Sequence, residues 1–239
     1  MPRLLPLVVA STLAALTADS PYTPAQLRTG GAPVLPIEAV GGGEVLVELD
    51  VNARGTVTQA RALRTTPPFT DVVMDAVRGW QFEPARELVQ ARGRSSSRAV
   101  PSSVLVAAVY RAPVLVGPTL GEPTRDVSPP SSAVASPATM PPPPFPPHAI
   151  LGGTVLLEVV IDADGAIENV AVLRAVPPFD EVAVKTVREW VFRPAQRDGV
   201  RAPAVVYVVF GFRAPTAELD GLLAPQRSAS QQHDGAWIE

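Results

Sequence analysis

The pentapeptide "WQFEP" occupies residues 80–84 and "WVFRP" occupies residues 190–194, so two of the three tryptophans of the chain share one short pattern 110 positions apart. Shifting the 239-residue chain by 110 aligns residues 44–86 with 154–196 without a gap, and 17 of these 43 positions are identical. After about eight extra residues within "ELVQARGRSSSR" of the first copy, the register resumes with Pro101 facing Pro203. Similarity at one fixed distance over this length indicates a duplicated structural unit.

Each copy shows the same order of expected elements. "EVLVELDV" (44–51) alternates apolar and acidic residues, which is typical of a half-buried strand, and Gly55 and Gly165 end turns that favour a hairpin. The second strand has inward candidates at Val57, Ala60 and Ala62, a spacing that predicts a β-bulge. An amphipathic helix ending at the tryptophan follows, and then the β-prone runs "SVLVAAVY" and "VVYVVFGF".

We therefore expect the α+β class, with two small β-β-α-β units, each a three-stranded antiparallel sheet plus one helix. A structural role at the junction of helix and sheet is the interpretation for the clamp residues Trp80, Phe82, Pro84, Trp190, Phe192 and Pro194. Residues 113–147 contain 12 prolines, which favours polyproline II and a semi-rigid linker. The expected division is a first domain at 36–112, a linker at 113–147, a second domain at 148–214 and a flexible tail at 215–239.

The N-terminal residues 1–20 contain Arg3 and an apolar run from Leu4 to Ala18. Fifteen residues at helical rise span roughly 22 Å, less than the ~30 Å of a bilayer core, so a secretory signal segment fits better than a spanning helix. A frayed apolar terminus is the alternative, and an inner-membrane anchor is left open. Net charge of −3 and a pI near 5.5 give no reason to expect nucleic acid as a partner.

The residues that carry catalysis in other proteins are scarce here. The chain has no cysteine, and its histidines are His148 in the proline-rich tract and His233 in the tail. "DADG" at 162–165 has part of a calcium-loop pattern, but Val160 stands where that pattern needs a carboxylate, so a turn is the better interpretation. The sequence predicts neither an enzyme nor a metal or cofactor site.

The second copy resembles the C-terminal domain of TonB-type energy transducers. The resemblance lies in Gly153, the Asp164–Gly165 turn, the run Trp190-Val191-Phe192-Arg193-Pro194-Ala195, and Gly199 with Pro203, and it extends more loosely to residues 42–111. It implies a periplasmic protein that binds extended peptides of outer-membrane transporters, with inner-membrane proton-driven motor proteins as further partners and a homodimer left open. Strand addition suits such binding, since an edge strand offers unpaired backbone groups.

The strand that matches the family's peptide-binding edge consists of Val205, Val206, Tyr207, Val208, Val209, Phe210, Gly211 and Phe212. Both of its faces are apolar, which suits either a binding edge or packing against a neighbouring unit or a dimer partner. The alternative function, from a different class, is an exported non-catalytic scaffold whose units pack on each other or self-associate without a transporter partner.

Overall fold

A computed structural model gives the fold and describes residues 22–36, 39, 41–91, 94–112 and 123–213. The N-terminal segment expected at 1–20 and the tail expected at 215–239 lie outside these residues. Within the described part, the first half contains β1 (Tyr22–Thr23), β2 (Gln26–Thr29), β3 (Gly43–Val51), β4 (Val57–Thr65), α1 (Phe69–Arg78), β5 (Gln81–Glu83), β6 (Arg86–Ala91), β7 (Arg94–Ala99) and β8 (Ser102–Tyr110). The second contains β9 (Arg125–Asp126), β10 (Ser136–Pro137), β11 (Gly153–Ile161), β12 (Ile167–Arg174), α2 (Phe179–Val187), β13 (Phe192–Arg193), β14 (Ala195–Arg197), β15 (Val200–Ala202) and β16 (Ala204–Phe212).

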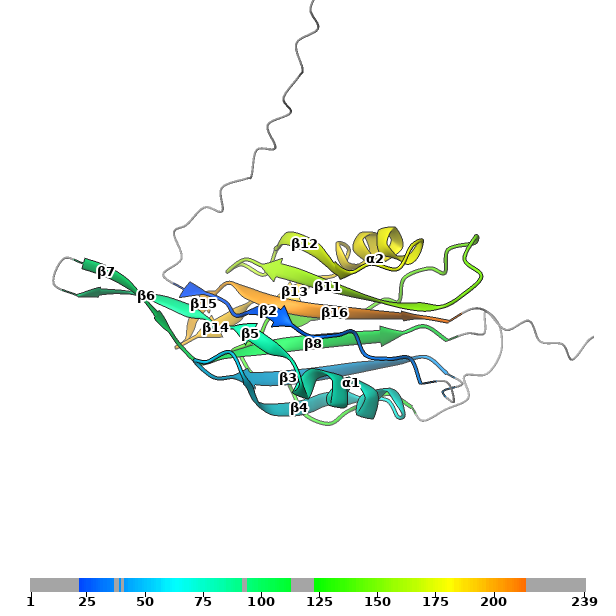
Figure 1. Ribbon diagram of the computed structural model, residues 1–239, viewed down its shortest axis with the longest axis horizontal. Coiled ribbons are helices and arrows are strands. Elements are labelled where there is room, and N and C mark those ends of the chain that lie inside the picture. Colours follow the sequence, from blue (N-terminus) through cyan, green and yellow to red (C-terminus); the bar gives the residue numbers. More distant parts are fainter. Residues whose placement is uncertain (1–21, 37–38, 40, 92–93, 113–122, 214–239) are drawn as a thin grey trace, which may run out of the picture.

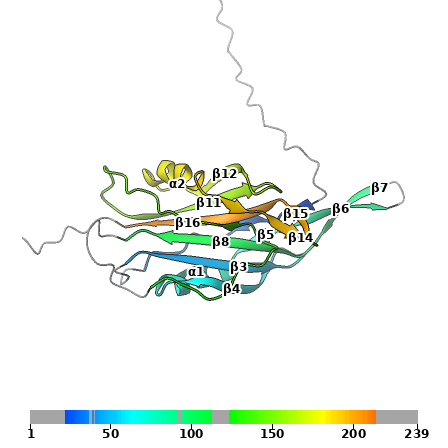
Figure 2. The same cartoon turned by 180° about the vertical axis from the view of Figure 1, so that it is seen from behind.

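The two halves share one sheet. Its strand order among the described residues is β12-β11-β16-β8-β3-β4-β9. Figures 1 and 2 show the strands from β12 to β4 side by side from opposite directions. All neighbouring pairs are antiparallel except β16 and β8, which run parallel from Val206 opposite Leu105 to Gly211 opposite Tyr110. The α+β class is confirmed, and the junction between the halves is a continuous ladder of backbone hydrogen bonds.

The expected bulge is present in both hairpins. The pairing of β3 with β4 shifts register between Asp50 and Val51, and that of β11 with β12 shifts between Val160 and Ile161. Gly55 and Gly165 adopt φ of 82° and 91° in the intervening turns, a region in which a side chain would be strained. The spacing of the inward-facing residues in the sequence was therefore enough to predict the bulge.

The helices pack on opposite faces of the sheet. Alternate residues of one strand point to opposite faces, and β16 shows the division: Val206 and Val208 belong to the core beneath α2, whereas Tyr207 and Val209 belong to the core beneath α1. Because β8 and β16 run parallel and the helices lie on opposite faces, the halves are related by an approximate twofold rotation. Its axis lies between β8 and β16 and runs along the strands. Each half supplies one helix to its own face.

The proline-rich tract is part of this fold. We name residues 22–36 the first arm and residues 123–147 the second arm. Val134, Ala135 and Met140 of the second arm are buried in the core beneath α2, where they meet Leu46 and Leu63 of the first half. The prediction of a spacer is therefore wrong for residues 123–147, because an extended proline-rich chain with apolar side chains can cover a sheet as well as span a gap.

The two arms make equivalent contacts. Gln26 and Leu27 of the first arm pair with Glu83 and Phe82, and the second arm repeats this pairing 110 residues later through β10 and β13. The first arm lies on the core that contains Tyr207 of the second half, and the second arm lies on strands of the first. Each arm thus pairs with a strand of its own half and also contacts the other half. Both arms lie ahead of the domain starts expected at 36 and 148.

Candidate binding surface

The strand expected to bind peptides at an edge lies in the middle of the sheet. β16 pairs with β11 from Ala204 to Phe212 and with β8 from Val206 to Gly211. All nine of its residues are buried. The prediction that Val205, Val206, Tyr207, Val208, Val209, Phe210, Gly211 and Phe212 form an open edge is wrong in this structure, because the first half occupies the position that an added peptide would take.

The apolar character of both faces of β16 is explained by this position. Tyr207 on the α1 face meets Trp80 and Phe82 of the first half, with ring centroids 5.5 and 5.8 Å away. Phe210 on the other face meets Trp190 at 5.5 Å. Packing on the neighbouring unit, the second interpretation of the sequence, is the one that the structure shows.

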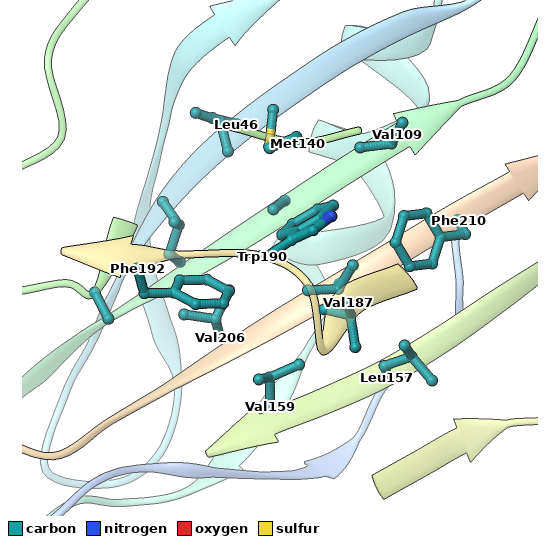
Figure 3. Close-up of a cluster of buried hydrophobic side chains, with 14 of the residues drawn as sticks. Leu46, Val109, Met140, Leu157, Val159, Val187, Trp190, Phe192, Val206 and Phe210 are labelled. Atoms are coloured by element: carbon teal, nitrogen blue, oxygen red, sulfur yellow. The ribbon is translucent and has the colours of Figure 1, made fainter. Parts of the chain in front are cut away.

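The six clamp residues lie between the helix ends and the sheet. Trp80, Phe82, Trp190 and Phe192 are buried, and Pro84 and Pro194 are half-buried directly after them. Figure 3 shows Trp190 between Met140 of the second arm and Val187 and Phe210. Trp80 Nε1 donates to the carbonyl oxygen of Gly31 at 3.1 Å, whereas Trp190 Nε1 is buried without a hydrogen-bond partner among the described residues.

The hydroxyl of Tyr207 links three elements. It donates to Glu158 Oε2 at 2.8 Å and accepts from the backbone N–H of Leu27 at 2.6 Å. Burial, together with the negative charge of Glu158, raises the pKa of Tyr207 far above its usual value. The phenol therefore stays protonated and holds the first arm on the sheet, which is a structural role.

One end of the sheet is covered by the second arm. The β9 residues Arg125 and Asp126 pair with Thr65 and Arg64 of β4, and the N–H of Val127 donates to the Leu63 carbonyl at 2.8 Å. Arg64 donates to both carboxylate oxygens of Asp126, at 2.6 and 3.3 Å. The hydrogen bond from Arg64 lowers the pKa of Asp126, and the hydrogen bond to Asp126 raises the pKa of Arg64.

The opposite end of the sheet is β12, which pairs only with β11 among the described residues. Leu173 and Arg174 are the equivalents of Leu63 and Arg64, 110 residues later, and both are exposed. Thr154 stands at the position of Glu44, the second carboxylate that contacts Arg64. Sequence reasoning did not single out Leu173 or Arg174, and only comparison with the covered half identifies them.

The described residues offer little for catalysis or metal binding. A cavity of about 460 Å³ lies where the second arm crosses β3 and β4, and its lining includes Leu46, Arg64, Asp126 and Ser128. The Arg64 guanidinium and the Asp126 carboxylate in this lining are already paired with each other. Nowhere in the described part of the chain do three His, Asp or Glu side chains gather in a way that could hold a metal ion.

Comparisons with known proteins assign the second half to a family. Residues 141–213 match the family model for the Gram-negative bacterial TonB protein C-terminal domain. A solution NMR structure of the Pseudomonas aeruginosa TonB C-terminal domain is 27% identical, covers 35% of this chain and 89% of its own length, and superimposes with a TM-score of 0.30. No curated protein matches the chain. Residues 141–213 thus form a domain of the TonB C-terminal family.

No helix among the described residues has the length and apolar character needed to cross a membrane.

Proposed function

We propose that this chain is a non-catalytic periplasmic binding protein that serves energy transduction for transport across the outer membrane. The observation that carries the proposal is the TonB C-terminal family match over residues 141–213. It is supported by the repetition of Trp-x-Phe-x-Pro-Ala in the first half. The partners are outer-membrane transporters, which offer extended segments to the periplasm, with inner-membrane motor proteins as the source of energy.

The location of β16 changes how such a partner would bind. Because β16 is hydrogen-bonded on both sides, a peptide would have to displace the β8 ladder to pair with it. Strand addition remains physically attractive, since it gains backbone hydrogen bonds without a preformed pocket. It requires a strand whose outer side is open.

A second candidate is an exported scaffold without a transporter partner. The observation in its favour is the internal pairing of β8 with β16. In this arrangement the two units pack on each other within one chain, as the scaffold alternative expects. Under this alternative, the chain has a structural role in the periplasm.

Transport measurements separate the two candidates. Deletion of the chromosomal copy and complementation by the full chain would be followed by uptake of substrates that require energised outer-membrane transporters. The proposal predicts reduced uptake on deletion and recovery on complementation. Unchanged uptake of every such substrate, with normal outer-membrane receptor levels, would contradict it and favour the scaffold.

A further inference from the structure

The first half of the molecule shows how an extended segment covers the outer edge of one of its hairpins. The segment Arg125–Ser128 lies antiparallel to the end of β4. The N–H groups of Val127 and Ser128 both donate to the carbonyl of Leu63, at 2.8 and 3.2 Å, and Asp126 binds the guanidinium of Arg64 through two hydrogen bonds. Backbone pairing and one charged pair therefore act together at this edge.

The same edge in the second half has the receiving groups, and no described segment pairs with its outer side. Leu63 and Leu173 are equivalent, but Leu63 is 1% exposed and Leu173 is 44% exposed. Among the described residues no ion pair engages Arg174, and Thr154 replaces the Glu44 that would otherwise compete for it. Val172, also exposed at 39%, extends the apolar part of this edge.

We propose that the end of β12, at Val172–Arg174, is the docking site for an extended peptide of a partner protein that carries an acidic residue opposite Arg174. The peptide adds antiparallel to β12, its N–H groups bond the Leu173 carbonyl, and its carboxylate binds the Arg174 guanidinium in a forked pair. The geometry of this site stands on its own, whereas the identification of the partner as an outer-membrane transporter rests on the proposed function.

The size of the edge favours a peptide over a second copy of the chain. Stable dimers bury on the order of 1,200–2,000 Å² in total, and a single eight-residue strand with two exposed apolar side chains offers much less than that. A short peptide needs only a few backbone bonds and one charged contact. In the first half, the segment Arg125–Ser128 binds the end of β4 in the way that we expect such a peptide to bind β12.

The probe is a synthetic peptide with the sequence of residues 123–130, "PTRDVSPP", added to the isotope-labelled full chain and followed by amide chemical shifts. We expect weak binding, with a Kd between about 10 µM and 1 mM, and shift changes concentrated at residues 171–175. Arg174→Ala should weaken binding by roughly threefold to tenfold, and the Asp126→Asn peptide should lose a similar factor. Arg28→Ala, an exposed arginine of β2, is the charge-matched control and should change nothing.

Reversing the charges of the proposed pair gives the most specific test of the site. Arg174→Asp should abolish binding of the original peptide and should restore it for the Asp126→Arg peptide. The proposal is overturned by an absence of binding up to about 1 mM, by binding that Arg174→Ala leaves unchanged, or by shift changes confined to β4. It is also overturned if the β12 amides are already protected in the free chain, or if they become protected only through a dimer that Arg174→Ala dissociates.

The same variants distinguish failure of the site from failure of the function. If Arg174→Asp binds no peptide but restores uptake fully in the deletion strain, the docking site is not used in transport and the proposed function stands. If the peptide binds as expected and deletion leaves uptake unchanged, the site stands and the transport function fails.

Discussion

Leu63 and Leu173 occupy equivalent positions in the two hairpins, yet Leu63 is 1% exposed and Leu173 is 44% exposed. The difference arises because the second arm crosses the end of β4 and no described segment crosses the end of β12. Leu63→Ala should therefore lower the free energy of unfolding by about 2–4 kcal/mol, because it leaves a cavity in the core. Leu173→Ala should lower it by less than about 1 kcal/mol, as exposed substitutions do.

Denaturant unfolding of the two variants checks this difference. Similar losses of unfolding free energy for both variants would show that Leu173 is buried by a segment of the chain. The edge of β12 would then not be open.

The contact between Gly211 and Tyr110 fixes the seam between the halves. The two residues are partners in the parallel ladder, and a Cβ on Gly211 would lie 2.3 Å from Tyr110 Cδ1. Tyr110 cannot move away easily, because its ring stacks on Phe69 at 4.3 Å. Gly211→Ala should therefore destabilise the chain by about 1–3 kcal/mol. Gly31→Ala, where a Cβ meets nothing within 4 Å, is the control and should change the unfolding free energy by less than about 0.5 kcal/mol.

The two clamp tryptophans differ in one hydrogen bond. Replacement of either by phenylalanine removes similar buried area, but only Trp80→Phe breaks a bond, that from Nε1 to Gly31. At position 190 the substitution removes a buried donor that has no partner among the described residues. We expect Trp80→Phe to cost about 1 kcal/mol more than Trp190→Phe in thermal or denaturant unfolding. An equal or larger cost at position 190 would contradict this difference.

The ion pair between Arg64 and Asp126 gives a weak pH dependence. The hydrogen bond from Arg64 lowers the pKa of Asp126, so its stabilisation is fully present above the unfolded value near 3.9 and is lost as pH falls through the lower folded value. Because the Asp126 side chain is 70% exposed, the contribution is only about 0.5 kcal/mol. Asp126→Asn should be less stable than the unchanged chain by this amount at pH 7 and equally stable near pH 2. A difference that persists in acid would mean that the charge of Asp126 is not its cause.

Local patterns predicted the elements well but not their assembly. The alternation in residues 44–51 and the spacing of Val57, Ala60 and Ala62 report contacts between neighbours in the chain, and the expected bulge is confirmed. The pairing of β8 with β16 depends on backbone groups, which are chemically the same in every strand. The one sequence signal for it was the apolar character of Tyr207 and Val209 on the second face of the strand.

The second arm was misread because prolines dominate its composition. Proline disfavours regular ladders but permits an extended chain that lies on an apolar surface. Met140 and Val134 of this chain are buried against the core beneath α2. A signal existed, since the shift of 110 also aligns Ala25 with Ala135 and Pro36 with Pro146. Arg174, by contrast, could be found only after Arg64 was seen in its contact with Asp126.

Amide hydrogen exchange along β16 tests the central claim most directly. If β16 lies between β11 and β8, the consecutive amides from Val206 to Phe210 should all exchange slowly, because each one is hydrogen-bonded to one neighbour or the other. In β12 only the amides that face β11 should be slow. Alternating fast and slow exchange along Val206–Phe210 would show that β16 is an open edge and would contradict the account.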